Sequence, residues 1–132
     1  MPFLGDTPRV NDIYIALTRV TSGIPQAGFY SNMSHFLLYN STSLRQNQWD
    51  HLAYVLNYPN HYFYLNGALV SSDTVNARPL NVFRNQTYIG RSNWHFILND
   101  KADADADFDD IKLFNIPLTQ SQVQFDMSNS LI

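Results

Sequence analysis

Cysteine and glutamate are both absent from the 132-residue chain. Without cysteine the protein has no disulfide scaffold, no thiol chemistry and no zinc site with Cys ligands. Charged residues make up only 14% of the chain and the net charge is −3. The sequence has no stripe of basic residues, so nucleic-acid binding is not expected. No apolar run approaches the roughly 18 residues of a membrane span, and the first ten residues do not form a signal peptide.

Aromatic residues are abundant at 14% of the chain, and the apolar share of 45% is ordinary for a globular protein. A chain of 132 residues has the size of one domain and buries enough apolar surface to fold without cross-links. Low charge with many aromatic, Asn and Ser residues is typical of all-β extracellular or virion modules. We therefore expect a single domain over residues 1–132.

The central stretch, residues 49–70, predicts two long strands and the start of a third. Asn66-Gly67 between two apolar runs is the strongest short hairpin signal, because both turn positions need a positive φ. Pro59-Asn60 interrupts the chain earlier and predicts the preceding turn. Between these turns, apolar side chains alternate with period two and occupy both faces of the strands. Such strands are expected in the middle of a two-sheet sandwich.

Further elements are predicted on either side of this centre. Thr119 and Gln122 form a capping box that starts a short C-terminal helix, which frays by Asn129. Strands are predicted, mainly from β-branched and aromatic residues, at residues 13–20, 29–32, 36–40, 82–83, 87–89 and 108–114. These elements predict an all-β, antiparallel two-sheet sandwich with one short C-terminal helix.

Four short motifs follow one another along the chain. They are Trp-x-His-x-Ala at 49–53, Phe-Tyr-Leu-Asn-Gly at 63–67, Thr-Tyr-Ile-Gly at 87–90, and a run at 108–115 followed by Leu118-Thr119. In this order and spacing they resemble the core signature of the laminin-G-like, concanavalin A-like lectin/glucanase modules. The resemblance covers residues 49–123 and implies a jelly-roll sandwich.

The chain departs from this family at two places. Ala106 stands where relatives often have Gly, and the first strand of the family has no clear counterpart here. Either that strand is degenerate within residues 1–10, or the chain starts after it. If the strand is missing, a sheet edge is left open, and an open edge invites a partner chain.

Asp103, Asp105 and Asp107 form the first candidate site. A run of alternating Asp residues binds Ca²⁺ when a loop folds the carboxylates inward, and many relatives in the resembled family hold Ca²⁺ at loop ends. In an extended run, alternate carboxylates lie about 6–7 Å apart, too far for three of them to share one ion. The alternative to a calcium site is a solvated acidic loop.

Arg91, Asn93, Trp94 and His95 form the second candidate site. An exposed Trp or His face stacks on a sugar ring, while Asn and Arg hydrogen-bond the hydroxyl groups, and loops on a rigid sandwich are suited to such a cluster. The alternative is that Trp94 closes one end of the core. His51 lies on an apolar strand face, where a satisfied core residue is expected rather than a ligand.

The resembled superfamily also contains glucanases, whose retaining members use paired glutamates as nucleophile and acid/base. This machinery cannot be present in a chain without glutamate. The sequence therefore predicts no enzyme, but a non-catalytic extracellular recognition module that binds glycan or protein through loops at one end of the sandwich. An alternative is a structural module of a fibre, appendage or virion surface, which packs through strand edges and flat faces.

Three N-glycosylation sequons begin at Asn32, Asn40 and Asn85 and are compatible with secretion. We expect a module that is extracellular or surface-exposed and forms part of a longer precursor. Its expected partners are a glycan or protein ligand and other domains or copies of the same assembly.

Overall fold

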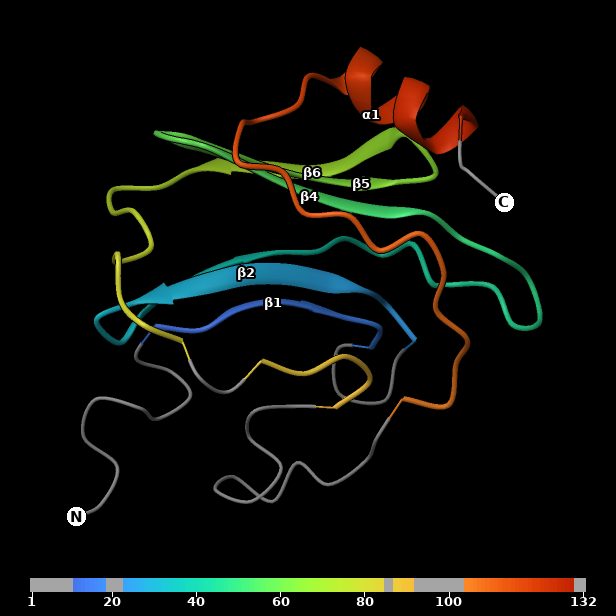
Figure 1. Ribbon diagram of the computed structural model, residues 1–132, viewed down its shortest axis with the longest axis horizontal. Coiled ribbons are helices and arrows are strands. Elements are labelled where there is room, and N and C mark those ends of the chain that lie inside the picture. The colour runs from blue at the N-terminus through green and yellow to red at the C-terminus, as the bar shows by residue number, and fades with distance from the viewer. Residues whose placement is uncertain (1–10, 19–22, 85–86, 92–103, 130–132) are drawn as a thin grey trace.

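The structure is a computed structural model that describes residues 11–18, 23–84, 87–91 and 104–129. It contains two antiparallel three-stranded sheets that face each other, and one helix above them (Figure 1). The strands are β1 (Ile13–Ala16), β2 (Gln26–Ser31), β3 (Ser34–Leu38), β4 (Leu52–Asn57), β5 (Asn60–Leu65) and β6 (Ala68–Thr74), and the helix is α1 (Gln120–Ser128). The predicted all-β sandwich with a short C-terminal helix is confirmed, and no described helix is long and apolar enough to cross a membrane.

The sheet formed by β4, β5 and β6 is the predicted central meander, with β5 in the middle. Leu52 lies opposite Leu65 in the first pair of strands, and Leu65 lies opposite Ala68 in the second. Asn66 and Gly67 have φ values of 52° and 78°, which is the positive-φ pair that a two-residue hairpin turn requires. The predicted hairpin is therefore confirmed.

Both faces of this second sheet are covered. Its inner face packs Phe63 against Ala27 and Leu38 of the first sheet. Its outer face packs Val55 and Tyr64 against Val123 of α1, and the outer cluster also includes Leu118. Burial on both sides explains why the strand sequences are apolar at successive positions rather than at every second one.

Helix α1 begins at the predicted capping box. The Gln122 backbone N–H donates to Thr119 Oγ1 at 3.2 Å, and the Thr119 N–H donates to Gln122 Oε1 at 2.8 Å. The side-chain amides of Gln120 and Gln124 both donate to the carbonyl of Gly67. These contacts hold the helix over the β5–β6 turn.

The strands predicted at 82–83, 87–89 and 108–114 are wrong, because the structure has irregular backbone in all three described stretches. The N–H of Val82 donates to the carbonyl of Leu80 at 3.0 Å, which bends the chain locally. Asp110 has a φ of +50° and interrupts the extended run in the third stretch. Alternation of apolar and polar residues was present there, but no described strand pairs with the segment.

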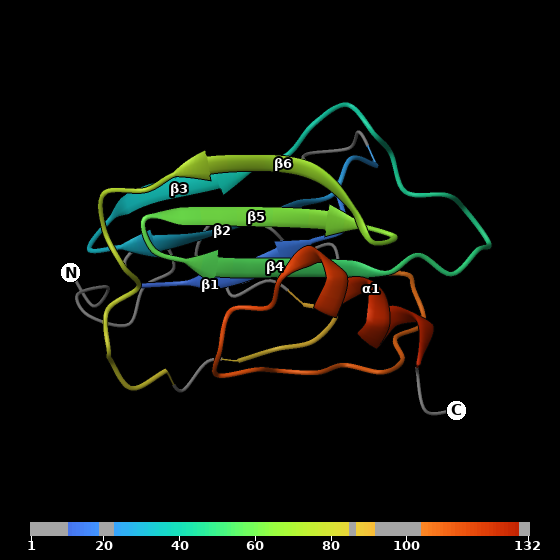
Figure 2. The same cartoon turned by 90° about the horizontal axis from the view of Figure 1, so that it is seen from above.

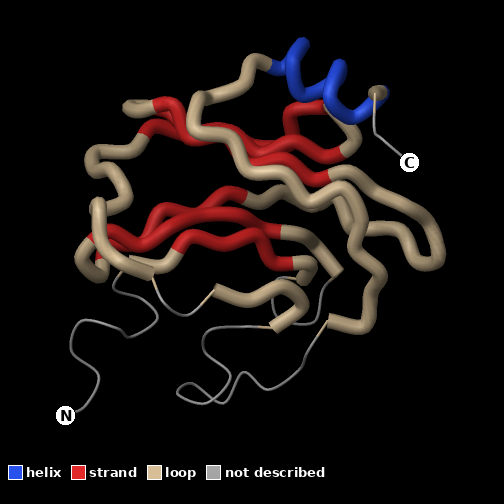
Figure 3. Tube along the Cα trace, in the orientation of Figure 1, coloured by secondary structure: helices blue, strands red, loops and turns tan. Residues whose placement is uncertain are grey.

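On one side of the sandwich, no further described strand pairs with the outer strands. The outer strands β1 and β4 end their sheets on the same side (Figure 2). Residues 104–118 cross this side as a loop on their way to α1 (Figure 3). We call the region formed by β1, β4 and residues 110–118 the open side.

Candidate functional site

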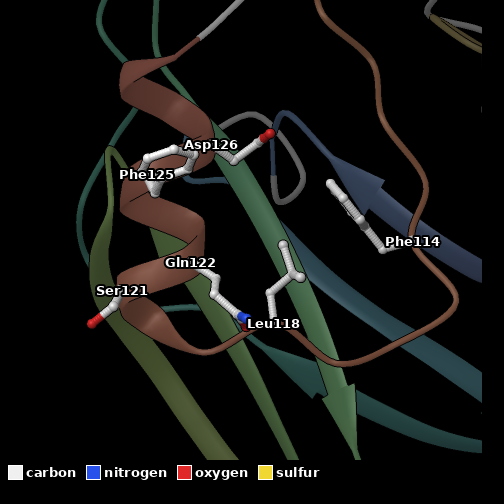
Figure 4. Close-up of a pocket in the computed structure, with 6 residues that line it drawn as sticks. All are labelled: Phe114, Leu118, Ser121, Gln122, Phe125 and Asp126. Carbon is white, nitrogen blue, oxygen red and sulfur yellow. The ribbon is translucent and has the colours of Figure 1, made fainter.

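The open side contains two neighbouring hollows. The larger, of about 510 Å³, lies between β1, β4 and residues 110–118 and also reaches Val123 and Asp126. The smaller, of about 420 Å³, lies between that segment and α1 and is lined by Phe114, Leu118, Ser121, Gln122, Phe125 and Asp126 (Figure 4). Because Phe114, Leu118 and Asp126 line both hollows, the two form one groove.

Large apolar side chains along residues 111–116 are exposed beside this groove. Leu113 is 98% exposed, Ile111 is 61% exposed and Ile116 is 59% exposed. Phe125 on the neighbouring helix is 70% exposed. An exposed cluster of this kind is a mark of an interaction surface, whereas a single exposed apolar residue is ordinary.

The backbone of β4 presents to the groove N–H and C=O groups that pair with no other described strand. The N–H of Asn66 donates to the carbonyl of His51 at 2.8 Å, so the backbone of His51 faces β5. Because neighbouring residues of an antiparallel strand point their N–H and C=O groups to opposite sides, those of Leu52, Tyr54 and Leu56 face outward. No backbone hydrogen bond joins these groups to any described residue.

The edge of β1 follows the same rule. The N–H of Tyr30 donates to the carbonyl of Asp12 at 2.8 Å, so Asp12 faces β2. Ile13 therefore points its backbone groups outward, as does Ile15 two residues later. Both side chains are almost half exposed and line the larger hollow.

Three polar side chains lie at the helix end of the groove. Lys112 Nζ and Asp126 Oδ1 form an ion pair at 2.8 Å, and the hydrogen bond from Lys112 to Asp126 raises the pKa of the lysine. His51 is half-buried beside them, and burial lowers its pKa although the carboxylate of Asp126 acts in the opposite direction. Its Nδ1 atom is buried without a hydrogen-bond partner. The sequence predicted a core histidine with all its hydrogen bonds made. The structure instead places His51 at the margin of the groove with one ring nitrogen lacking a hydrogen bond to any described residue.

A second polar cluster fixes the loop before β4. Arg45 Nε donates to Asp50 Oδ1 at 2.9 Å, and Asn66 Nδ2 donates to the same oxygen at 2.9 Å. Burial alone would raise the pKa of Asp50, but the hydrogen bonds from Arg45 and Asn66 outweigh it, so the pKa is lowered. Trp49 beside this cluster is 66% exposed. The cluster joins the start of the Trp-x-His motif to the β5–β6 turn.

The predicted ligand cluster is described only at Arg91. This residue is exposed, and its guanidinium carbon lies 5.9 Å from the centre of the Tyr88 ring. Asn93, Trp94 and His95 lie outside the described residues. The cluster therefore stays a prediction, with Tyr88 as an added aromatic neighbour that the sequence did not single out.

The predicted calcium ligands are described at two of three positions. Asp105 and Asp107 are both exposed, and Asp103 lies outside the described residues. Across the described part of the chain, no group of three His, Cys or acidic side chains is placed to hold a metal ion. Two exposed carboxylates supply fewer oxygen atoms than the six to eight that Ca²⁺ takes, so the calcium site stays a prediction.

The groove itself was not found from the sequence. Part of its lining, between Asp110 and Phe114, belongs to the segment 108–114, whose alternation predicted a strand of the sandwich. The sequence did give one hint of the groove. The first strand of the family has no clear counterpart in this chain, and its loss predicts an unpaired sheet edge. That expectation gave no position for the edge.

The fold resembles that of a solved protein. The chain matches a crystal structure of part of an S-layer domain-containing protein from Clostridium thermocellum, with a TM-score of 0.58 and 20% sequence identity. The match covers 89% of this chain and 58% of that chain, so this module spans little more than half of its length. At this identity the likeness shows the fold alone. Among curated protein sequences, none matches significantly.

A family model gives the assignment. The model described as the concanavalin A-like lectin/glucanases superfamily, laminin G type, matches residues 7–124. This range includes all six strands and the first half of α1. The chain therefore belongs to the laminin G-like family of the concanavalin A-like lectin/glucanases superfamily.

Proposed function

We propose that the chain is a non-catalytic module of a surface protein that recognises a polypeptide through its open side. The observation that carries the proposal is the exposed apolar cluster of residues 111–116, which lies beside a groove and two outer strands. The family and the likeness to an S-layer domain-containing protein support a place at a cell surface. Of the two functions predicted from the sequence, these observations favour packing through strand edges over recognition of a ligand by loops.

The chemistry of the groove supports binding rather than catalysis. Its lining is mostly aliphatic and aromatic, and of its three charged groups Lys112 and Asp126 form an ion pair, which leaves Asp110. An apolar cleft of several hundred Å³ with few polar groups is typical of ligand sites. A polypeptide is favoured as the ligand because β4 offers main-chain donors and acceptors along the same groove.

Selection from a random peptide library tests this function. The parent protein and two variants are used as targets: Leu113→Ser in the exposed cluster and Phe83→Ser as a matched control. Phe83 is 88% exposed and lies outside the groove lining. We expect peptides that bind the parent and the control but lose binding to Leu113→Ser. No enriched peptide, or equal binding to all three proteins, would overturn the proposal.

Glycan recognition is the second candidate function. The exposed Arg91 over the Tyr88 ring favours it, because an aromatic face and a guanidinium group are suited to sugar rings and hydroxyls. A glycan array with Arg91→Ala and the parent protein tests this candidate. Binding that is lost in the variant supports it, and an array without binders contradicts it.

The calcium site has its own test within this candidate. Changing Asp103, Asp105 and Asp107 together to Asn keeps their size but removes three charges. If Ca²⁺ binds there, the variant has a lower melting temperature than the parent in Ca²⁺ and an equal one in chelator. Identical melting curves of variant and parent in Ca²⁺ would rule out the site.

A further inference from the structure

We infer that the outer edge of β4 is a strand-addition site for an extended peptide in which apolar and basic side chains alternate. The inference rests on the proposed function, since it names the polypeptide that the open side takes. It goes further by stating how the peptide binds, which is by main-chain pairing with β4. It also states which side chains the peptide carries.

The main chain of β4 provides the first part of the argument. The strand has six residues, and the N–H and C=O groups of Leu52, Tyr54 and Leu56 face away from β5. A free edge of this length is a template for another strand, which would lie about 4.8 Å away. Within the part of the chain that the structure describes, residues 110–118 pass this edge without pairing with it.

The groove determines which side chains of the peptide are buried. Side chains of an added strand point alternately to its two faces, and the face toward the first sheet meets the larger hollow. Ile13 and Ile15 of β1 line that hollow together with Leu52 and Leu56 of β4. Apolar residues at every second position of the peptide would therefore be buried between the two sheets.

The charges of residues 104–118, which cross the open side, determine which polar side chains the peptide carries. Asp105, Asp107, Asp109 and Asp110 are exposed, and none of them forms an ion pair with a described residue. Lys112 within the same segment is already paired with Asp126. Of these four aspartates, Asp110 lines the groove, and with Lys112 and Asp126 the described lining has one more negative than positive group, which favours Lys or Arg at the remaining positions of the peptide.

Charge also decides between a partner and a second copy. The chain has a net charge of −3, and pairing two copies through the open side would bring the acidic segments of both together. Like charges facing each other across an interface are unfavourable. A basic segment of another polypeptide is the occupant that complements this surface.

The test uses the whole protein and a peptide of alternating Lys and Val residues, as long as β4. Calorimetry at low salt gives the dissociation constant, and hydrogen exchange shows which amides the peptide protects. We expect protection at Leu52, Tyr54 and Leu56. We also expect a loss of at least about tenfold when the peptide is N-methylated on alternate residues, because its main-chain donors are removed.

Two protein variants test the charge argument. Asp109→Asn with Asp110→Asn should weaken binding about twofold to fivefold at low salt, and Asn also tolerates the positive φ of Asp110. Asp73→Asn on β6 is the matched control, because this carboxylate is exposed on a different strand and should leave binding unchanged.

The outcomes separate this inference from the proposed function. Equal binding of the N-methylated peptide, or of a peptide of alternating Asp and Val, would overturn the inference. Peptide binding that depends on Leu113 but protects no β4 amide would also overturn it, while the proposed function would stand. A library selection without binders would overturn the proposed function itself.

Discussion

At the residue scale, hydrogen bonds hold the side chains of two titratable groups in place. Asp50 accepts from Arg45 and from Asn66, and its side chain is only 8% exposed. His61 is 1% exposed, and its Nδ1 lies 2.9 Å from the hydroxyl oxygen of Tyr54. Arg45 and Tyr54 are close in sequence to their partners, whereas Asn66 reaches Asp50 from the β5–β6 turn, which only the folded structure brings near.

Replacing Asp50 by Ala should lower the free energy of unfolding by about 1–3 kcal/mol, because Arg45 and Asn66 lose a charged acceptor. The pKa of Asp50 is lowered in the fold, so its contribution is present above the ordinary carboxyl pKa and is lost as the pH falls through the folded value. Urea unfolding of Asp50→Ala and of the control Asp73→Ala measures the effect. Equal losses in both variants would contradict the assignment.

His51 and His61 predict a second pH dependence. Burial lowers the pKa of both His51 and His61, whereas in the unfolded chain they take up protons near the ordinary value of 6.5. Stability should therefore be complete above about pH 6.5 and should fall as the pH decreases below it. Urea unfolding between pH 5 and pH 8 measures this slope. His61→Asn should flatten it, and an unchanged slope in this variant would contradict the role of His61.

At the element scale, the Asn66-Gly67 turn joins the central hairpin to the helix. Gly67 has a φ of +78°, and its carbonyl accepts hydrogen bonds from Gln120 and Gln124. A Cβ atom at this position would lie 3.0 Å from Gln124 Cγ and 3.2 Å from Met127 Cε. Glycine is needed here both for the backbone conformation and for the close approach of α1.

Gly67→Val should lower the free energy of unfolding by more than about 1 kcal/mol. Gly23→Val is a suitable control, because Gly23 also has a positive φ of 72° but no atom within 4 Å of an added Cβ. The control should lose less stability than Gly67→Val, since it carries the backbone strain without the contact. Thermal unfolding followed by circular dichroism compares the two variants. If both lose the same stability, contact with the helix does not matter.

At the scale of the whole molecule, the middle and outer strands of each described sheet differ in how completely they are paired. The middle strands β2 and β5 have neighbours on both sides, whereas β1 and β4 have one. Residues 108–114, which the sequence assigns to a strand, cross the open side without pairing with any described strand. Amides paired on both sides of a strand open only in large unfolding events, and unpaired amides open locally.

Hydrogen exchange should therefore be slowest in β2 and β5 and fast in residues 108–114. The outward amides of β4, at Leu52 and Tyr54, should exchange faster than the amides of Val55, which faces β5. Exchange followed by NMR resolves these positions. Protection of residues 108–114 equal to that of β5 would mean that the segment forms a strand after all.

Local pattern was sufficient for the elements whose interactions are close in sequence. The Asn66-Gly67 hairpin depends on two turn residues, and the start of α1 depends on Thr119 and Gln122 within one helical turn. The family assignment follows from short motifs in order, and the sequence also excludes paired glutamates. These features could be predicted because their physical causes lie within a few residues.

The tertiary structure alone decided which described strands have no neighbour on one side. Residues 108–114 have the alternation of a strand, but a strand exists only where another backbone supplies its hydrogen bonds. The groove, the free edge of β4 and the exposure of Leu113 all depend on that missing pairing. Side-chain alternation is encoded in one segment, whereas pairing depends on two segments, and therefore the sequence determined the sandwich and only the fold determined its open side.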